Sequence, residues 1–445
     1  MSWFTTTPRS HVPMTTIGQH AAIERVAMLS VHTSPVATLG SKDAGGMNVH
    51  VRELAYELGR EGVEVDLFTR RSDPVTPEVV QIADRVRVVT IDAGPPEPMT
   101  KDDVFCVLPE FATQCALYSL RAGTRYDIVH SHYWLSGWAS HLLQRYWNAP
   151  TVHTFHTLAR LKNAVYQNGV AESDVRSQVE RRLLDVIDYV IAPNPDERAE
   201  MVWRMGGVNS RICIIPPGVD LTRFHPGDAH HARARLDLPA NPLVLFVGRI
   251  DPMKGIDTLL DAFASLRAEP WPDLPPKLIF IGGTLIDGRP DPDLSAVIHR
   301  AEVLGIRDDV LFRGSAPQEI LPDYYAAATV AAVPSRYESF GLVAVEAMAC
   351  GLPVVASRAG GLKFTVEDGR SGILVPSEQP RMFASAMSRV IRDPGLRSSL
   401  QVGARQAAIR FSWHAVGPAM LNLYERLSEG ERENLCCPGE VSDAS

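Results

Sequence analysis

The stretch SRYESFGLVAVEAMACGLPVVASRAGG, residues 335–361, carries the clearest chemical pattern in this chain. Glu338 and Glu346 stand eight residues apart across the start of an apolar helix. Eight helical positions span about 12 Å, roughly the length of a sugar nucleotide from ribose to hexose. The helix start near Phe340 and Gly341 would offer free backbone N–H groups to a pyrophosphate. The spacing therefore predicts a sugar-nucleotide site with a carboxylate at each end to accept hydrogen bonds from hydroxyl groups.

A structural interpretation of the same two glutamates competes with this one. A glutamate before a helix often only complements the helix dipole, and Glu346 could be an ordinary solvated residue. The segments on both sides of Glu346, LVAV and AMA, are apolar. Because a charge in such a setting is costly unless it is paired or liganded, the setting favours a binding role for Glu346.

Two cations follow another expected strand, in FVGRIDPMKG at residues 246–255. Arg249 leaves the strand and Lys254 precedes a helix, which suits a diphosphate leaving group whose negative charge grows as its bond breaks. A pair of surface charges is the alternative, and it is stronger for Lys254 alone. Gly45 and Gly46 open an earlier helix, where backbone N–H groups could approach a phosphate, although a simple tight turn would need the same residues. The pattern departs from GxGxxG, so we do not expect a nicotinamide site.

Histidines gather at two expected strand ends, in VHSHYWLSG and TVHTFHTLARLKN. The four are His130, His132, His153 and His156. Their spacing matches no zinc motif, so we expect hydrogen bonding to a sugar hydroxyl, with one or two of the rings packed in the core instead.

Composition and order place these residues in a two-domain α/β protein. The chain has 445 residues, of which 45% are apolar and 22% charged, and its net charge of −8 argues against a nucleic-acid surface. No apolar run is long enough to span a membrane, no signal sequence is evident, and the six cysteines show no metal-ligand spacing, so reduced thiols and a cytoplasmic location are expected. Short β-branched runs alternate with helical stretches, which predicts parallel α/β layers. The expected strands are 25–31, 63–69, 86–91, 127–130, 151–155, 189–192 and 212–215, then 243–247, 277–281, 310–313, 330–333, 354–356 and 373–375.

We expect the linker between the two domains to be the Pro- and Gly-rich stretch at residues 214–242. Residues 1–23 are expected to be a disordered extension, 24–235 the first domain and 236–413 the second. A last helix, 414–427, returns to the first domain, and 428–445 form a loose tail.

The segments ESFGLVAVE, FVGRIDPMKG, PPGVDLTRF and AGGMNVHVRELAYEL resemble the retaining glycosyltransferases of the GT-B fold, family four. The resemblance covers about residues 25–427. It implies two Rossmann-like, doubly wound domains facing across a cleft, with the acceptor on the first and the nucleotide sugar on the second. It also implies that Arg249 and Lys254 bind the diphosphate, Glu338 the donor sugar and Glu346 the ribose, with Gly46 behind the diphosphate. Phe340 and Gly341 complete the donor set.

Within this family the chain is most similar to the enzymes that glycosylate an inositol phosphate in mycothiol biosynthesis. The shared segments are RVAMLSVHTSP, DAGGMNV, HSHYWLSG and HT-x-HTL-x₃-KN. This resemblance implies an acceptor site made of His32, Asn48, Lys101, Tyr133, Thr157 and Arg176. From the residues alone, Lys101 and Arg176 look like solvated charges; the resemblance makes them an anion clamp. The implied catalytic residues are His156, Arg249, Lys254 and Glu338.

The expected reaction moves a hexosyl unit, N-acetylglucosamine or glucose, from a nucleotide diphosphate such as UDP to a phosphorylated polyol. Because retaining glycosidases hold two carboxylates about 5 Å apart, Glu338 and Glu346 are too distant for that mechanism and front-side attack is favoured. No cofactor beyond the donor co-substrate is expected, and no acidic cluster demands the magnesium described for the inositol-phosphate branch. Lys363 and Thr329 depart from the usual pattern beside the donor.

Other functions remain open. Transfer to a sugar phosphate, as in sucrose-phosphate synthases, and a catalytically silent nucleotide-sugar sensor are the main alternatives. A lipid glycosyltransferase at a membrane surface is disfavoured because residues 104–120 lack a basic face. Small molecules are the expected partners, and a homodimer is compatible with the sequence.

Overall fold

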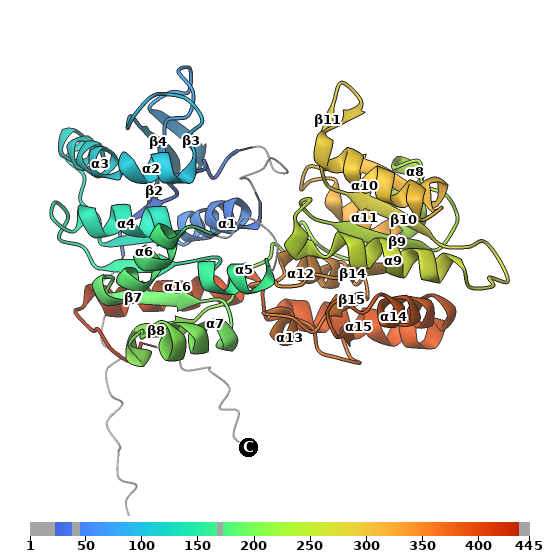
Figure 1. Ribbon diagram of the computed structural model, residues 1–445. Helices are drawn as coiled ribbons and strands as arrows, with labels where there is room; N and C mark the ends of the chain where they lie inside the picture. The colour runs from blue at the N-terminus through green and yellow to red at the C-terminus, as the bar shows by residue number, and fades with distance from the viewer. Residues whose placement is uncertain (1–22, 38–44, 167–171, 436–445) are drawn as a thin grey trace, which may run out of the picture.

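The computed structural model describes residues 23–37, 45–166 and 172–435, and within these the chain forms two lobes that lie side by side (Figure 1). Residues 1–22 of the expected extension 1–23, and residues 436–445 of the expected tail, lie outside the described residues. The first lobe holds an eight-stranded sheet in the order β3-β4-β2-β1-β5-β6-β7-β8, parallel except for the β3–β4 pair. Its strands are β1 Arg25–Leu29, β2 Glu64–Arg70, β3 Val79–Ala83, β4 Val86–Ile91, β5 Ile128–His132, β6 Thr151–Thr154, β7 Tyr189–Ala192 and β8 Ile212–Ile214.

The second lobe holds a six-stranded parallel sheet in the order β13-β10-β9-β14-β15-β16. A short hairpin, β11 Leu285–Ile286 and β12 Arg289–Pro290, stands apart from it. The strands of this sheet are β9 Leu243–Val247, β10 Lys277–Ile281, β13 Val310–Gly314, β14 Val330–Val333, β15 Val354–Ser357 and β16 Gly372–Val375. All the strands expected from β-branched runs are present, and the GT-B type of α/β fold is confirmed.

Helices connect the parallel strands and cover the sheets in both lobes (Figure 1). In the first half they are α1 Gly46–Arg60, α2 Lys101–Cys106, α3 Leu108–Ala122, α4 Trp134–Leu143, α5 Ala159–Val165, α6 Asp174–Val186 and α7 Pro195–Ala199. In the second half they are α8 Ala229–Arg235, α9 Ile256–Arg267, α10 Pro292–Val303, α11 Leu321–Ala327, α12 Leu342–Ala349, α13 Leu362–Thr365, α14 Pro380–Arg392, α15 Pro394–Ile409 and α16 Trp413–Ser428. The helix α16 returns to the first lobe and packs against α1.

The two crossings between the lobes touch each other. Val219, on the outward crossing, forms a β-bridge with Ser412, on the return crossing. Trp413 lies so close to Gly218 that a Cβ added there would meet the indole Cδ2 at 2.4 Å. Glycine is therefore required at 218 by close approach rather than by its backbone angle. This contact joins the first turn of α16 to the outward crossing.

Candidate active site

The carboxyl ends of β1, β5 and β6 in the first lobe and of β9 and β14 in the second carry most of the predicted site residues. Contacts between the lobes bring these two edges together. The side chain of Arg249 lies against Gly45, with its Nε 3.3 Å from the position a Cβ would take. A Cβ on Gly46 would meet Leu342, at the start of α12, at 3.3 Å. The two loops predicted to flank a diphosphate thus face each other, as expected for ligands at the ends of parallel strands.

Lys254 and Glu338 form an ion pair on the second lobe. The Lys254 Nζ lies 2.6 Å from Glu338 Oε2, and both side chains are about one-fifth exposed. Lys254 comes from the 3₁₀ turn before α9, and Asp251 caps that turn through the backbone N–H of Met253. The pair places one cation and one carboxylate next to each other at the β9 edge, as a site for a diphosphate and a sugar hydroxyl requires.

The structure departs from the assumption that eight helical positions separate Glu338 from Glu346. The helix α12 begins at Leu342, so Glu346 is helical but Glu338 lies in the bend before it. The span of about 12 Å, which assumed eight helical positions, therefore does not apply. Gly341 precedes the helix with φ +94°, a conformation that favours glycine. The side chain of Phe340 is buried against Phe411 in the core, so only its backbone is placed to serve a ligand.

Glu346 is buried and hydrogen-bonded. Tyr325 donates its hydroxyl to Glu346 Oε2 at 2.9 Å, and the Gln318 amide lies 3.5 Å from Oε1. Burial raises the pKa of Glu346 to about 7, and the Tyr325 hydroxyl and the charge of Arg223 oppose that rise. The surface interpretation of Glu346 is therefore wrong. A buried carboxylate with hydroxyl and amide partners has the chemistry to accept hydrogen bonds from ribose.

Three predicted acceptor residues gather near the ring of a fourth, Tyr133, in the first lobe. Arg176 stacks on Tyr133 at 4.7 Å and Lys101 Nζ lies 5.9 Å from the same ring centroid. Arg176 donates from Nη1 to the Tyr133 hydroxyl at 3.0 Å and from Nη2 to Thr157 Oγ1 at 3.1 Å. The interpretation of Arg176 as a solvated charge is wrong, because its side chain is only 1% exposed.

Arg176 also has two carboxylate partners that the sequence prediction missed. Its Nε donates to Glu180 at 2.6 Å, and its Nη1 lies 2.9 Å from Glu172. Glu172 precedes α6, and Arg176 and Glu180 lie within it, each four residues after the one before. This i,i+4 pattern in ESDVRSQVE is the sequence signal that could have revealed the two carboxylate partners.

Two other acceptor candidates have supporting positions. Asn48 is fully buried and accepts a hydrogen bond from the Gly45 N–H at 3.0 Å while donating to Thr33 and Ser34. It therefore fixes the glycine loop that faces Arg249. The ring of His32 lies 4.5 Å from the ring of Tyr133, beside the arginine cluster.

The histidines divide into core and site residues. His130 bonds to Tyr424 and Thr154, and His153 bonds to Ser131, so these two are packed core residues, as the structural alternative held for one or two of them. His132 Nδ1 lies 3.0 Å from His156 Nε2.

Burial, reinforced by neighbouring histidines, lowers the pKa of both His132 and His156 well below the usual value, so both are neutral at pH 7. Backbone strain marks the same place, since Tyr133 has φ +74° and His156 has φ +61°. Non-glycine residues with such angles cluster at functional sites. His132 was grouped with the other histidines in the sequence but not assigned to the site.

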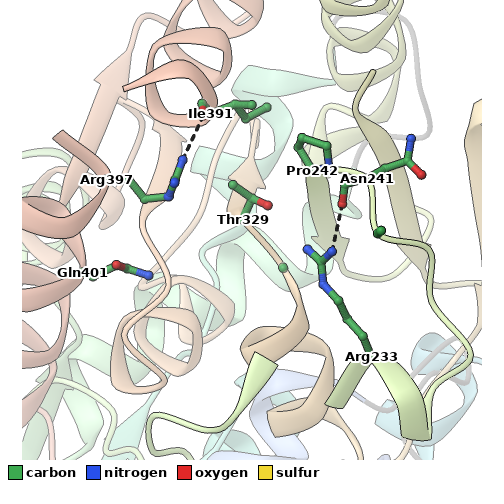
Figure 2. Close-up of a pocket in the computed structure, with 9 residues that line it drawn as sticks. Arg233, Asn241, Pro242, Thr329, Ile391, Arg397 and Gln401 are labelled. Carbon is green, nitrogen blue, oxygen red and sulfur yellow. Dashed lines mark hydrogen bonds between the residues drawn. The ribbon is translucent and has the colours of Figure 1, made fainter. Parts of the chain in front are cut away.

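A pocket elsewhere in the second lobe does not belong to the candidate active site. Arg233 and Arg397 both line this cavity (Figure 2), which has a volume of about 300 Å³. Arg233 donates to the carbonyl of Ala327, the last residue of α11. Arg397 donates to the carbonyl of Ile391, in the last turn of α14. Both guanidinium groups are thus explained as helix C-terminal caps. The pocket lies at the amino ends of β9 and β14, the edge opposite the candidate site.

The two positions that depart from the family pattern also have structural roles. Thr329 lines the pocket of Figure 2 and accepts a hydrogen bond from the Leu243 N–H at 3.0 Å, so it lies away from the candidate donor site. Lys363 forms an ion pair with Asp196 of the first lobe. Neither contact involves the Lys254–Glu338 pair.

Membrane-spanning helices and metal clusters are both absent from the described residues. None of the helices in that part of the chain is long and apolar enough to cross a membrane. Over the same residues, no group of three His, Cys, Asp or Glu side chains is arranged to hold a metal ion.

Sequence families match both halves of the chain. "Glycosyl transferases group 1" matches residues 231–407, and "Glycosyltransferase Family 4" matches residues 44–223. The D-inositol 3-phosphate glycosyltransferase of Kineococcus radiotolerans is 42% identical over 419 residues, which cover 91% of this chain and 96% of the relative. The protein of the same name from Streptomyces bingchenggensis is 42% identical over 417 residues, covering 92% of this chain and 90% of the relative.

Solved structures agree with the sequence matches. Sucrose-phosphate synthase from Thermosynechococcus elongatus has a TM-score of 0.84 and 36% identity, covering 92% of this chain and all of that one. The Anabaena protein HepE in complex with UDP and glucose has a TM-score of 0.71 at 20% identity, covering 91% of this chain and all of that one, which supports the fold alone. With both halves matched and full-length relatives above 40% identity, the chain belongs to the GT-B glycosyltransferases that combine a family 4 N-terminal domain with a group 1 C-terminal domain.

Proposed function

We propose that this protein is a retaining glycosyltransferase that moves N-acetylglucosamine or glucose from a UDP-sugar to a phosphorylated polyol such as 1D-myo-inositol 3-phosphate. The observation that carries the proposal is the cluster of Arg176, Tyr133, Thr157 and Lys101 on the first lobe. A guanidinium, an ammonium and two hydroxyl groups around one point are the donors that suit a phosphate. The names of the relatives, D-inositol 3-phosphate glycosyltransferases, favour inositol as the polyol.

The donor would bind along the edge of the second lobe. Lys254 and Arg249 would hold the diphosphate, Glu338 would accept hydrogen bonds from the sugar hydroxyls, and Glu346 would accept them from the ribose. Gly46 would close the diphosphate site from the first lobe. Lys254 and Glu338 form an ion pair. When the donor binds, its phosphates would contact Lys254 and its sugar hydroxyls would contact Glu338.

The transfer would follow front-side attack. The bond between the anomeric carbon and the diphosphate oxygen breaks, the acceptor hydroxyl oxygen bonds to the same face of that carbon, and its proton passes to the departing phosphate oxygen. Arg249 and Lys254 stabilise the charge on the leaving group as it grows. Neutral His156, whose Nε2 lies 3.0 Å from His132 Nδ1, would hydrogen-bond the transferred sugar. Contact between the lobes would exclude water from the reacting atoms.

Transfer to a sugar phosphate is a second candidate function, because the sucrose-phosphate synthase structure is similar over its whole length. Both functions require an anion site for the acceptor, so the cluster around Tyr133 does not separate them. A silent sensor is disfavoured because Arg249, Lys254, Glu338 and Glu346 are all present.

Product analysis tests the proposal. UDP-N-acetylglucosamine and UDP-glucose are each incubated with 1D-myo-inositol 3-phosphate, fructose 6-phosphate or water alone, and the products are identified by mass spectrometry and NMR. A glycosylated inositol phosphate with the anomeric configuration of the donor supports the proposal. A fructose product would favour the second function, an inverted configuration would overturn the mechanism, and binding without any product would favour the sensor.

A further inference from the structure

The two carboxylates on Arg176 are held in different ways. Glu180 is 1% exposed, and its second oxygen accepts a hydrogen bond from the Ala159 N–H at 2.8 Å. Its side chain is therefore fixed by both the guanidinium and the start of α5. Glu172 is 16% exposed, and the other partner of its carboxylate is Lys162, at 2.5 Å. Glu180 is thus a built-in counter-charge, whereas Glu172 lies nearer to solvent between two long cations.

Neutralising Arg176 requires only one of these carboxylates. A buried guanidinium needs a partner, and Glu180 supplies it through a charged hydrogen bond of 2.6 Å. Glu172 instead contacts Nη1, the same nitrogen that donates to the Tyr133 hydroxyl. That nitrogen belongs to the cluster that would hold the acceptor phosphate. The Glu172 carboxylate thus lies where an anion of the acceptor would bind.

From these contacts we propose that Glu172 is a specificity-determining residue: its carboxylate competes for Arg176 with the phosphate of the acceptor, and the phosphate displaces it. The proposal rests on the proposed function, because it assumes a phosphorylated acceptor at Arg176. A phosphate carries nearly two negative charges and three acceptor oxygens, so it can replace a carboxylate on both Arg176 and Lys162. A neutral polyol cannot.

Charge balance supports this exchange. When a phosphate dianion replaces the Glu172 carboxylate, the three cations Lys101, Lys162 and Arg176 face one fixed carboxylate and one dianion, and the charges match. If the Glu172 carboxylate stayed in place, it would add like-charge repulsion at close range. The backbone of Glu172 does not have to move, because it is held separately by the Asn163 side chain at 2.7 Å. Side-chain rotation is sufficient for the exchange.

The variant Glu172→Gln tests the proposal, because it keeps the shape of the side chain and removes the charge. Binding of inorganic phosphate and of 1D-myo-inositol 3-phosphate is measured by calorimetry, with myo-inositol and UDP as reference ligands. We expect the Kd of both phosphorylated ligands to fall about tenfold. The Kd of UDP is expected to stay unchanged, because the donor site lies on the other lobe. An unchanged or higher Kd for phosphate would overturn the proposal and show that Glu172 serves to align Arg176.

A matched control comes from the other carboxylate. Glu180→Gln also removes one charge from Arg176 but loosens a fixed residue, so we expect weaker phosphate binding and a lower melting temperature. Equal gains in both variants would show a general electrostatic effect and overturn a specific role for Glu172. Inorganic phosphate keeps this result separate from the proposed function: wild-type protein that makes no product from either phosphorylated acceptor would refute the proposed reaction, whereas unimproved phosphate binding in Glu172→Gln would refute only the competition.

Discussion

At the residue scale, Lys254 and Glu338 are two charges that each fit a surface role in the sequence but form an ion pair in the candidate site. Their contact of 2.6 Å joins positions 84 residues apart in the chain. Each residue alone fits a surface role. Together with Arg249, which faces the glycine loop of the other lobe, they would provide the charges that we propose for binding a nucleotide diphosphate sugar.

Replacing Lys254 by alanine is expected to lower kcat by about 100-fold, because a cation on the leaving group acts mainly as its charge grows. Steady-state kinetics with saturating acceptor measure the effect. Lys363→Ala is the matched control, since it removes a lysine that also pairs with a carboxylate but has no contact with the pair at the β9 edge. A raised KM for the donor with unchanged kcat would contradict the role of Lys254 as a group that stabilises the leaving group.

Glu346 gives a prediction about stability and pH. Burial raises its pKa to about 7 in the folded protein, while an unfolded glutamate titrates near 4.3. The folded protein thus holds a proton that the unfolded chain releases, and this contribution to stability is complete below pH 4 and lost as the pH rises through 7. Glu346→Gln cannot ionise, so its free energy of unfolding relative to wild type should rise between pH 5 and pH 8, by up to about 3 kcal/mol.

Urea unfolding of both proteins at pH 5, 6.5 and 8 measures this difference. Glu302→Gln, at an exposed position on α10, is the control and should follow wild type at each pH. Parallel pH curves for wild type and Glu346→Gln would show that Glu346 does not titrate in this range.

At the scale of elements, strands with a simple pattern were predicted well and irregular segments were not. Buried parallel strands such as β9 and β15 read as continuous apolar runs, which set them apart from helices of mixed polarity. The edge strand β3 was missed because none of its residues is buried and it pairs antiparallel with β4 through a turn at Arg85, φ +58°. The bend that carries Glu338 was missed because the apolar pattern of α12 does not show where the helix begins.

The candidate site could likewise be predicted only in part from the sequence. Residues in linear motifs, such as Arg249 and Glu346, could be proposed as site residues from the sequence, and their roles stay predictions. The cluster on Arg176 could be assembled only by resemblance, because α2, α6 and the ends of β5 and β6 contribute to it from distant parts of the chain. The opposing roles of Glu172 and Glu180 depend on burial, which the i,i+4 spacing alone does not give.

The crossing at Gly218 provides a prediction at this scale. Gly218→Ala would place a methyl group 2.4 Å from the Trp413 indole, so the crossing or α16 must shift. We expect a loss of about 1–3 kcal/mol in the free energy of unfolding, the usual cost of overpacking. Thermal unfolding measures it, with Gly395→Ala in the first turn of α15 as a control that meets only an Asp393 oxygen at 3.3 Å. Equal melting temperatures for the two variants would contradict a tight contact at the crossing.

For the whole molecule, both lobes are needed to complete the site. The Tyr337 hydroxyl contacts Glu197 across the interface, the Asn194 amide donates to the Ser339 carbonyl at 2.6 Å, and Arg52 donates to Gln318 at 2.8 Å. Tyr337 and Ser339 flank Glu338, so the segment that carries this proposed donor ligand is held by contacts from the first lobe. We therefore expect the proposed donor and acceptor edges to act as a single site, in which the acceptor decides which reaction occurs.

The most direct test of this conclusion is the ratio of kcat/KM for 1D-myo-inositol 3-phosphate to that for myo-inositol, measured by UDP release from UDP-N-acetylglucosamine. We expect a ratio of about 100 or more, because the cluster of Arg176, Lys101, Tyr133 and Thr157 is proposed to bind the phosphate through charged hydrogen bonds. A ratio near one, or release that does not depend on either acceptor, would contradict the assignment of this cluster to an acceptor phosphate.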